Sequence, residues 1–380
     1  MMDIKEPIAR NVGARADSLI ALSERIHSHP ETAWEEHRAA AWVAEALDAG
    51  GFDVTASYLG LETALLATAG SGPFRVGICA EYDALPGLGH ACGHNLIAAT
   101  SVGASLALAP LADDLGITVE LYGTPAEEGG GGKIEMLDRG AFAGLDLAML
   151  AHPAPVDVAE ARPFAVSHSR VEYRGKAAHA AAYPEQGVNA ADAFIIAQTA
   201  IGLLRQQLPD GVRVHGIVTH SGEAPNAIPE LTQGRWYIRA ETLADLAEIE
   251  PRVRHCFEAG ALATGCELGV TPESKPYSEF RTDGRALAAY RRNAEALGRS
   301  FAGADVAARM NRASTDMGNV SQVVAAIHPY VGIGSLPALN HQREFAAHCV
   351  GGLAERALLD AAVALAWTAV DSRAKASHVD

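Results

Sequence analysis

The sequence predicts an α/β protein in which a domain with a mostly parallel sheet is interrupted by an inserted α+β domain. Helical and strand patterns alternate through residue 153 and return after residue 275. The stretch between them carries strands of alternating polar and apolar residues beside two long helical patterns. We therefore expect a discontinuous first domain, residues 1–165 and 275–380, and an inserted domain, residues 166–274.

In the first part of the chain, helices are recognised by apolar residues at helical spacing and strands by short, β-rich apolar runs. Gly50 and Gly51 mark the end of the second helix. The expected helices are 15–27, 34–50, 95–109 and 133–142. The expected strands are 74–80, 117–125 and 146–153.

Three or four antiparallel strands and two helices would make the insert a compact α+β domain. Its expected strands are 166–175, 212–222 and 232–241, and its expected helices are 188–208 and 243–265. The α/β texture then returns with a helix near 284–297, a strand near 328–333 and a closing helix near 351–369.

Composition and charge exclude several classes of partner. The 380 residues carry a formal net charge of −16, which repels nucleic acids and anionic membranes. No basic start precedes an apolar run, and no apolar stretch reaches the roughly 18 residues of a membrane span. The five scattered cysteines are expected to be reduced thiols of a cytoplasmic protein.

Residues that bind metals cluster in segments that follow predicted strands. These segments are EYDALPG (81–87), HACGHN (90–95), TPAEEGGGG (124–132) and AHP (151–153), with NHQREF (340–345) further downstream. The carboxyl ends of parallel strands meet at one edge of the sheet, where such folds place ligands. Cys, His and Glu side chains converging there would form a mixed N/O/S metal site.

Cys92 and His94 are separated by one glycine, so both side chains can reach one ion or two adjacent ions. The alternative is that Cys92 is a small core residue and His94 merely begins a helix. Asn95 suits the N-cap of that helix under either interpretation. His90 is expected to be structural and is not assigned as a ligand.

Glu127 and Glu128 form the most informative acidic pair. Adjacent carboxylates point in different directions, so one can bind metal while the other takes a proton from water. A solvated acidic turn is one alternative; a phosphate-binding loop is disfavoured because Ile134, not Ser or Thr, follows Lys133. His152, before Pro153, is a further candidate ligand, and Asp83 could support a ligand histidine or lie in a solvated turn.

These segments, taken together and in this order, resemble the M20 metallopeptidase/amidohydrolase family over nearly the whole chain. RIHSHPETAWEE (25–36), AAHAAAYPEQGVNA (177–190) and APNAIPE (224–230) add to the match. Cys92 stands where the common branch has a bridging aspartate, so the chain resembles the cysteine-containing branch. EYDALPG with STDMGNVS (314–321) points to the sub-branch around peptidase M20 domain-containing protein 2 and the aminobenzoyl-glutamate hydrolase subunit.

The resemblance implies a zinc-peptidase-like catalytic domain with two divalent metal ions and an inserted dimerisation domain. It implies that Glu127 is the general base, that His179 polarises the scissile carbonyl and that Asp83 supports a ligand. Asn226 would contact the substrate; Arg239 is a weaker candidate for its carboxylate, because it could equally be a solvated strand residue. The implied metal ligands are Cys92, His94, Glu128, His152 and His341.

The expected activity is hydrolysis of an amide bond in a small N-acyl amino acid, aminoacyl conjugate or dipeptide by a homodimer. Zinc is the expected metal because a thiolate favours it, with manganese and cobalt as alternatives. Two other classes compete with this prediction: a metal-bound but catalytically idle binding or partner subunit, and a thiol enzyme that uses Cys92 as nucleophile.

Overall fold

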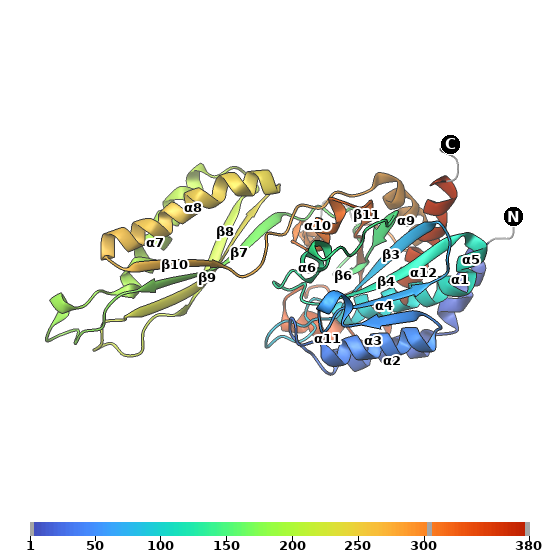
Figure 1. Ribbon diagram of the computed structural model, residues 1–380, viewed down its shortest axis with the longest axis horizontal. Coiled ribbons are helices and arrows are strands. Elements are labelled where there is room, and N and C mark those ends of the chain that lie inside the picture. The colour runs from blue at the N-terminus through green and yellow to red at the C-terminus, as the bar shows by residue number, and fades with distance from the viewer. Residues whose placement is uncertain (1–3, 302–305, 377–380) are drawn as a thin grey trace. The chain divides into compact units, whose positions relative to one another are not determined.

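The computed structural model describes residues 4–301 and 306–376, which form two compact units (Figure 1). Unit 1 comprises Met1–Pro163 and Phe280–Asp380, and unit 2 comprises Phe164–Glu279. Unit 2 thus begins two residues before position 166 and ends five residues after position 274, the boundaries that the sequence suggests.

Unit 1 is built on a six-stranded sheet with the order β1-β2-β4-β3-β5-β11. The neighbours β4, β3, β5 and β11 run parallel, whereas β1 and β2 are antiparallel to the strands beside them. This confirms the prediction of an α/β fold with a mostly parallel sheet. The strands are β1 (Asp53–Ala56), β2 (Leu65–Ala69), β3 (Phe74–Glu81), β4 (Ile117–Thr124), β5 (Leu147–Met149) and β11 (Ala326–Ile327).

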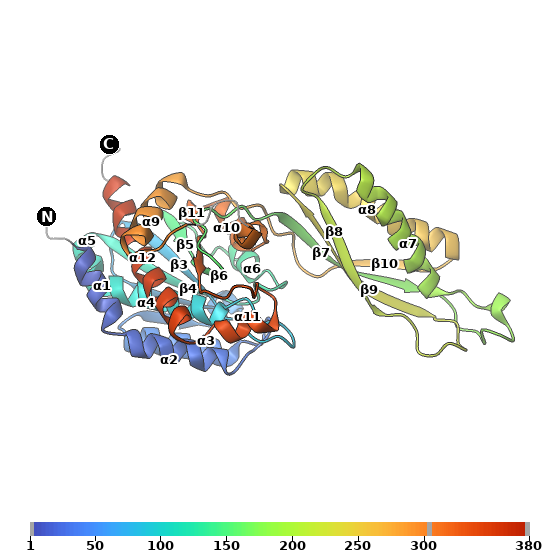
Figure 2. The ribbon, with the colours of Figure 1, turned by 180° about the vertical axis from the view of Figure 1, so that it is seen from behind.

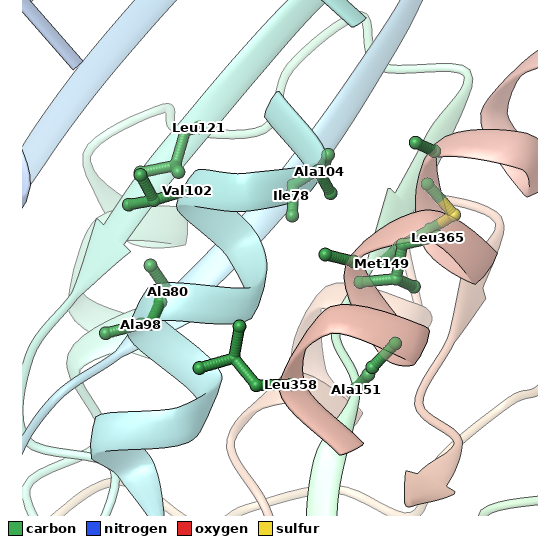
Figure 3. Close-up of a cluster of buried hydrophobic side chains, with 14 of the residues drawn as sticks. Ile78, Ala80, Ala98, Val102, Ala104, Leu121, Met149, Ala151, Leu358 and Leu365 are labelled. Carbon is green, nitrogen blue, oxygen red and sulfur yellow. The ribbon is translucent and has the colours of Figure 1, made fainter. Parts of the chain in front are cut away.

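The central strands are apolar along their length because helices cover both faces of the sheet. One face packs against α4 (His94–Leu108), α9 (Gly284–Ala296) and α12 (Gly352–Ala376), which Figure 2 shows in front of the strands. The other face packs against α6 (Gly132–Asp138) and α10 (Met317–Ser321). Figure 3 shows part of the hydrophobic core between the sheet and helices α4 and α12. The labelled residues are Ile78, Ala80, Ala98, Val102, Ala104, Leu121, Met149, Ala151, Leu358 and Leu365.

Helix α4 is the centre of unit 1, and every one of its residues is buried. By length and composition alone, residues 94–115 could cross a membrane. However, 83% of the most apolar stretch of 18 residues within this segment is buried inside the structure. Packing between the sheet and α12 therefore accounts for their apolar character. The other α-helices among the described residues of unit 1 are α1 (Lys5–Gly13), α2 (Ala16–His27), α3 (His37–Ala49), α5 (Ala112–Leu115) and α11 (Arg343–His348).

The strand expected at 146–153 is in fact two strands. After β5 the chain leaves the central sheet, and β6 (His152–Ala154) pairs in parallel with β12 (Tyr330–Gly332). Pro153 has no N–H to donate, which suits a short, separate ladder better than an interior strand. The break brings His152 to the edge where the other strands of the sheet end.

Unit 2 has one antiparallel sheet, with the order β10-β7-β9-β8, and two helices packed against one of its faces. Asn189 caps the first helix by accepting a hydrogen bond from the Ala191 N–H, and Thr242 forms a capping box with Asp245 at the second. The elements are β7 (Ala165–Arg174), α7 (Ala190–Leu204), β8 (Arg213–His220), β9 (Leu231–Ala240), α8 (Leu243–Thr264) and β10 (Glu267–Pro272).

Candidate metal centre

The predicted ligand segments of unit 1 meet at the carboxyl edge of the sheet. The segment after β3 carries Asp83, and the turn that begins α4 carries Cys92 and His94. The loop after β4 carries Glu127 and Glu128. Chain direction alone gathers these side chains, because parallel strands release their following loops at the same edge.

Asp83 ties two of these loops together with its two carboxylate oxygens. Oδ1 lies 2.9 Å from Nδ1 of His94, and Oδ2 accepts a hydrogen bond of 2.9 Å from the backbone N–H of Glu128. The contact at Nδ1 leaves Nε2 of His94 as the atom that faces the site. Asp83 therefore orients one candidate ligand directly and another through its backbone.

Cys92, His94 and His152 form the first group of candidate ligands. Their donor atoms all lie within 4.8 Å of one another, and all three residues are buried. Cys92 Sγ is 3.5 Å from His152 Nε2, while His152 Nδ1 is 2.7 Å from the carbonyl oxygen of Pro153. The latter contact leaves Nε2 of His152 to face the thiol.

Cys92 also belongs to a second group, with Glu128 and His341, so its sulfur is shared by two neighbouring sites. His341 Nε2 lies 3.4 Å from Glu128 Oε1, and the His341 side chain is 53% exposed. Two sites that share a thiolate suit a pair of ions. The structure thus brings together all five residues that the sequence nominates as ligands.

The turn around Cys92 depends on a close approach that only glycine permits. Gly93 has φ +82°, and a Cβ there would lie 2.9 Å from two atoms of Pro153. The backbone between the two donors therefore packs directly against the segment that carries His152.

Burial and charge act in opposite directions on the two histidines of the first group. Burial lowers the pKa of His152 to about 3, which keeps its imidazole neutral and able to bind metal. Burial also opposes a charged His94, but Asp83, Glu81 and Glu128 outweigh it and raise the pKa of His94 to about 10. Without a metal ion, the ring of His94 is therefore held as the charged imidazolium, with protons on both nitrogens.

The two adjacent glutamates are also set apart by their surroundings. Burial, together with the charges of Glu81 and Glu128, raises the pKa of Glu127. Burial opposes ionisation of Glu128 as well, but His341 and His94 outweigh it and lower its pKa to about 2. Carboxyl groups whose pKa values are pushed apart can take separate roles, one as a ligand and one as a proton carrier.

The donor set fits a pair of divalent ions. Thiolate, imidazole and carboxylate are the ligands of zinc sites, and Nε2 of His94 is a buried ring nitrogen that makes no hydrogen bond with any described residue. Unpaired buried polar atoms are costly, and coordination to a metal would satisfy this one. Burial raises the pKa of the Cys92 thiol, so a cation is also needed to hold it as thiolate.

Glu36 is a residue of this region to which the sequence assigns no role. Its buried carboxylate accepts hydrogen bonds from the N–H of Ala126 (2.8 Å), the N–H of Trp34 (3.0 Å) and the Thr63 hydroxyl (2.8 Å). Ala126 has φ +55°, in the left-handed region that is unfavourable for alanine. Glu36 thus holds a strained residue immediately before Glu127, although only its place in RIHSHPETAWEE could have indicated it.

His90 is fully enclosed and takes no part in the ligand groups. Its ring stacks on that of His27 with 6.1 Å between centroids, and neither ring nitrogen has a hydrogen-bond partner among the described residues. Burial lowers its pKa to about 3. The structural role of His90 stays a prediction.

His179, Asn226 and Arg239 lie in unit 2. The backbone of His179 pairs with Ala227, and the N–H of Ala180 donates to the carbonyl oxygen of Asn226 at 2.9 Å, so the His179 and Asn226 loops lie side by side. Both side chains are exposed. Arg239, on β9, donates from Nε to His215 Nε2 at 3.2 Å.

Comparison with known proteins agrees with this architecture. The family model described as Peptidase family M20/M25/M40 matches residues 77–355. The Xaa-Arg dipeptidase of Mus musculus is 40% identical over 97% of this chain and 88% of its own length. A p-aminobenzoyl-glutamate hydrolase subunit of Escherichia coli (strain K12) is 34% identical over 64% of this chain and 55% of its own length. The crystal structure of the Bacillus subtilis YXEP protein, described as a dinuclear metal binding peptidase, has a TM-score of 0.68 and 21% identity, covering 94% of this chain and 98% of that one.

The protonation of the metal-free site predicts that metal affinity rises with pH. The pKa of His94 is raised to about 10, and that of Cys92 is raised well above the ordinary thiol value. His94 is therefore charged and Cys92 is a neutral thiol near neutral pH. Each must lose its proton to bind metal, so uptake should release protons from at least these two groups. Calorimetric zinc titrations in buffers of different ionisation enthalpy, from pH 6 to 8, measure this release. Uptake without proton release, and an affinity that is constant with pH, would contradict the assignment.

The raised pKa of Glu36 predicts that this residue lowers the stability of the folded protein as the pH rises, whereas metal affinity increases with pH. Burial, followed by the charge of Asp83, raises the pKa of Glu36 from 4.5 to about 7, so the folded state favours the protonated acid. The wild type should therefore lose stability relative to Glu36→Gln as the pH rises through this window, by on the order of 3 kcal/mol in total. Urea denaturation of the chelated proteins at several pH values gives the two curves. If the free energies of unfolding of the wild type and Glu36→Gln depend on pH in the same way, the pKa of Glu36 is not raised by folding.

Proposed function

This chain belongs to peptidase family M20/M25/M40, and we propose that it hydrolyses an amide bond in a dipeptide, N-acyl amino acid or aminoacyl conjugate with the aid of two divalent ions. One observation carries the proposal: five donor residues converge in two groups that share Cys92, and Glu127 lies beside them. The names of the dipeptidase and hydrolase relatives support small amide substrates.

The ions, when bound, would polarise the substrate carbonyl and lower the pKa of water toward about 7. Cys92 would be shared between the two positions, His94 and His152 would complete one, and Glu128 and His341 would complete the other. We propose zinc as the native metal because a thiolate donor favours it.

Glu127 acts as the general base in this proposal. Its Oε2 lies 3.9 Å from Nε2 of His94, at the edge of the donor set and only 7% exposed. The carboxylate accepts a proton from the attacking water and returns it to the nitrogen of the leaving amine. A cation at the neighbouring donors would favour its ionised form.

We propose that His179 donates a hydrogen bond to the scissile carbonyl and that Asn226 contacts the substrate. Their loops are adjacent in unit 2, since the His179–Ala227 bridge joins them. The resemblance to the family suggests that His179 acts across a homodimer through unit 2. Arg239 is proposed to bind the substrate carboxylate.

Glu127→Gln should abolish turnover and leave metal binding intact. Removing a general base typically lowers the rate by about 10²–10⁴-fold, whereas the neutral amide removes no proposed ligand. The assay is hydrolysis of a panel containing Xaa-Arg dipeptides, p-aminobenzoyl-glutamate and N-acetyl amino acids, with metal content determined on the same samples. His152→Ala is the matched variant and should instead lose metal.

The same panel distinguishes the competing functions. A wild type that retains turnover after chelation would indicate a thiol enzyme that uses Cys92. Bound metal without turnover on any substrate would indicate a binding or partner subunit. Full activity of Glu127→Gln would show that the base is assigned to the wrong residue.

Mixing two inactive variants tests whether His179 acts across a dimer. If it does, a heterodimer of Glu127→Gln and His179→Ala contains one complete site, so random exchange of equal amounts should restore about a quarter of wild-type activity. Activity is measured after the mixture has exchanged subunits, with each variant alone as control. A mixture that stays as inactive as its parents, although heterodimers are shown to form, would place His179 in its own subunit's site.

A further inference from the structure

A buried cluster of three charged residues lies beside the candidate metal centre. Lys133 Nζ is 2.6 Å from Glu81 Oε1 and 2.6 Å from Asp316 Oδ1. The backbone N–H of Lys133 also donates to Asp316 Oδ2 at 2.8 Å. All three side chains are fully buried, and they come from the end of β3, the first turn of α6 and the residue before α10.

Lys133 and Asp316 together already account for a structural role. Asp316 receives both the ammonium group and the backbone N–H of the same residue, which joins α6 to α10. Glu81 adds a second carboxylate to a single ammonium, so the cluster carries one net negative charge without contact with water. Buried charge is unfavourable unless an opposite charge lies near, so this cluster favours a cation beside it.

The second oxygen of Glu81 indicates where that cation belongs. Oε2 makes no hydrogen bond with any described residue and lies 3.6 Å from Nε2 of His94, which is also buried without a hydrogen bond. Donor atoms that bind one ion at about 2.0–2.2 Å are themselves roughly 3–3.6 Å apart. The two atoms therefore face each other at the separation of two ligands of one ion.

The candidate ligand groups also place Glu81 beside His94. Glu81, His94 and Glu127 offer donor atoms that all lie within 4.8 Å of one another, and His94 also belongs to the group with Cys92 and His152. Glu81 thus approaches the centre through a histidine that is already a candidate ligand.

We propose that Glu81 is a further metal-binding residue, whose Oε2 serves the ion held by His94 while Lys133 holds its other oxygen. The inference rests on the metal centre of the proposed function. Lys133 and Asp316 are then positioning residues: Asp316 fixes Lys133, and Lys133 fixes Glu81. The net negative charge of the cluster complements the cation.

The test compares Glu81→Gln with Glu120→Gln. Glu120 is also buried on the central sheet and is paired to a cation, with Oε1 2.6 Å from Arg75, but it belongs to no ligand group among the described residues. Both variants lose one buried carboxylate, so a general loss of stability should affect both. Only Glu81→Gln should bind one of two ions about 10- to 100-fold more weakly, as measured by competition of Zn²⁺ with a chromophoric chelator.

A spectroscopic readout separates ligation from a structural role. The visible absorption of Co²⁺-loaded protein depends on the ligands, so it should change in Glu81→Gln and match the wild type in Glu120→Gln. If Glu81→Gln does not fold, Glu81→Asp keeps a carboxylate at the site and should show a smaller change of the same kind. Suppose that the wild type and Glu81→Gln both bind two ions with equal affinities and give the same spectrum. This result would overturn the proposed role of Glu81 but not the metal centre. A wild type that binds no ion would overturn the proposed function, and this inference with it.

Discussion

The carboxylate of Asp83 is the contact on which the centre of this protein depends. It joins the ring of His94 at the start of α4 to the backbone of Glu128 in the loop after β4, with both distances at 2.9 Å. Parallel strands bring these segments to the same edge, but the carboxylate fixes which atom of His94 faces inward. A ring turned by half a rotation about its Cβ–Cγ bond would place the carbon Cε1 where Nε2 now faces the other donors.

Electrostatics explain why this arrangement calls for metal. Glu81, Asp83, Glu127 and Asp316 are all buried at one edge of the sheet, and Lys133 is the buried lysine among them. Dense negative charge in a dry environment is unfavourable without cations. Two divalent ions would balance that charge, ionise Cys92 and satisfy the unpaired atoms of His94 and Glu81. The acidic cluster, the thiol and the neutral His152 therefore have one common explanation.

The sequence predicts the sheet edge and most of its candidate ligands, because both depend on the order of strands and loops along the chain. Apolar periodicity located β3, α4 and β4, and strand direction placed their following loops together. The short strand β1 carries mostly exposed residues and no apolar run, so periodicity did not reveal it. The roles of Glu36 and Glu81 depend on side chains that meet across distant segments, and in the sequence both resemble ordinary acidic residues near a turn. In the sequence Lys133 suggests only a phosphate-binding loop, because nothing in its neighbours indicates burial between two carboxylates.

The central claim is that the carboxyl edge of this sheet holds two ions that share Cys92. Crystallographic anomalous difference maps of zinc-loaded protein, recorded on both sides of the zinc absorption edge, test it most directly. The account predicts two zinc peaks, both within bonding distance of Cys92 Sγ, one beside His94 and His152 and the other beside Glu128 and His341. Peaks that avoid Cys92, or a fully loaded protein with no zinc at this edge, would contradict it.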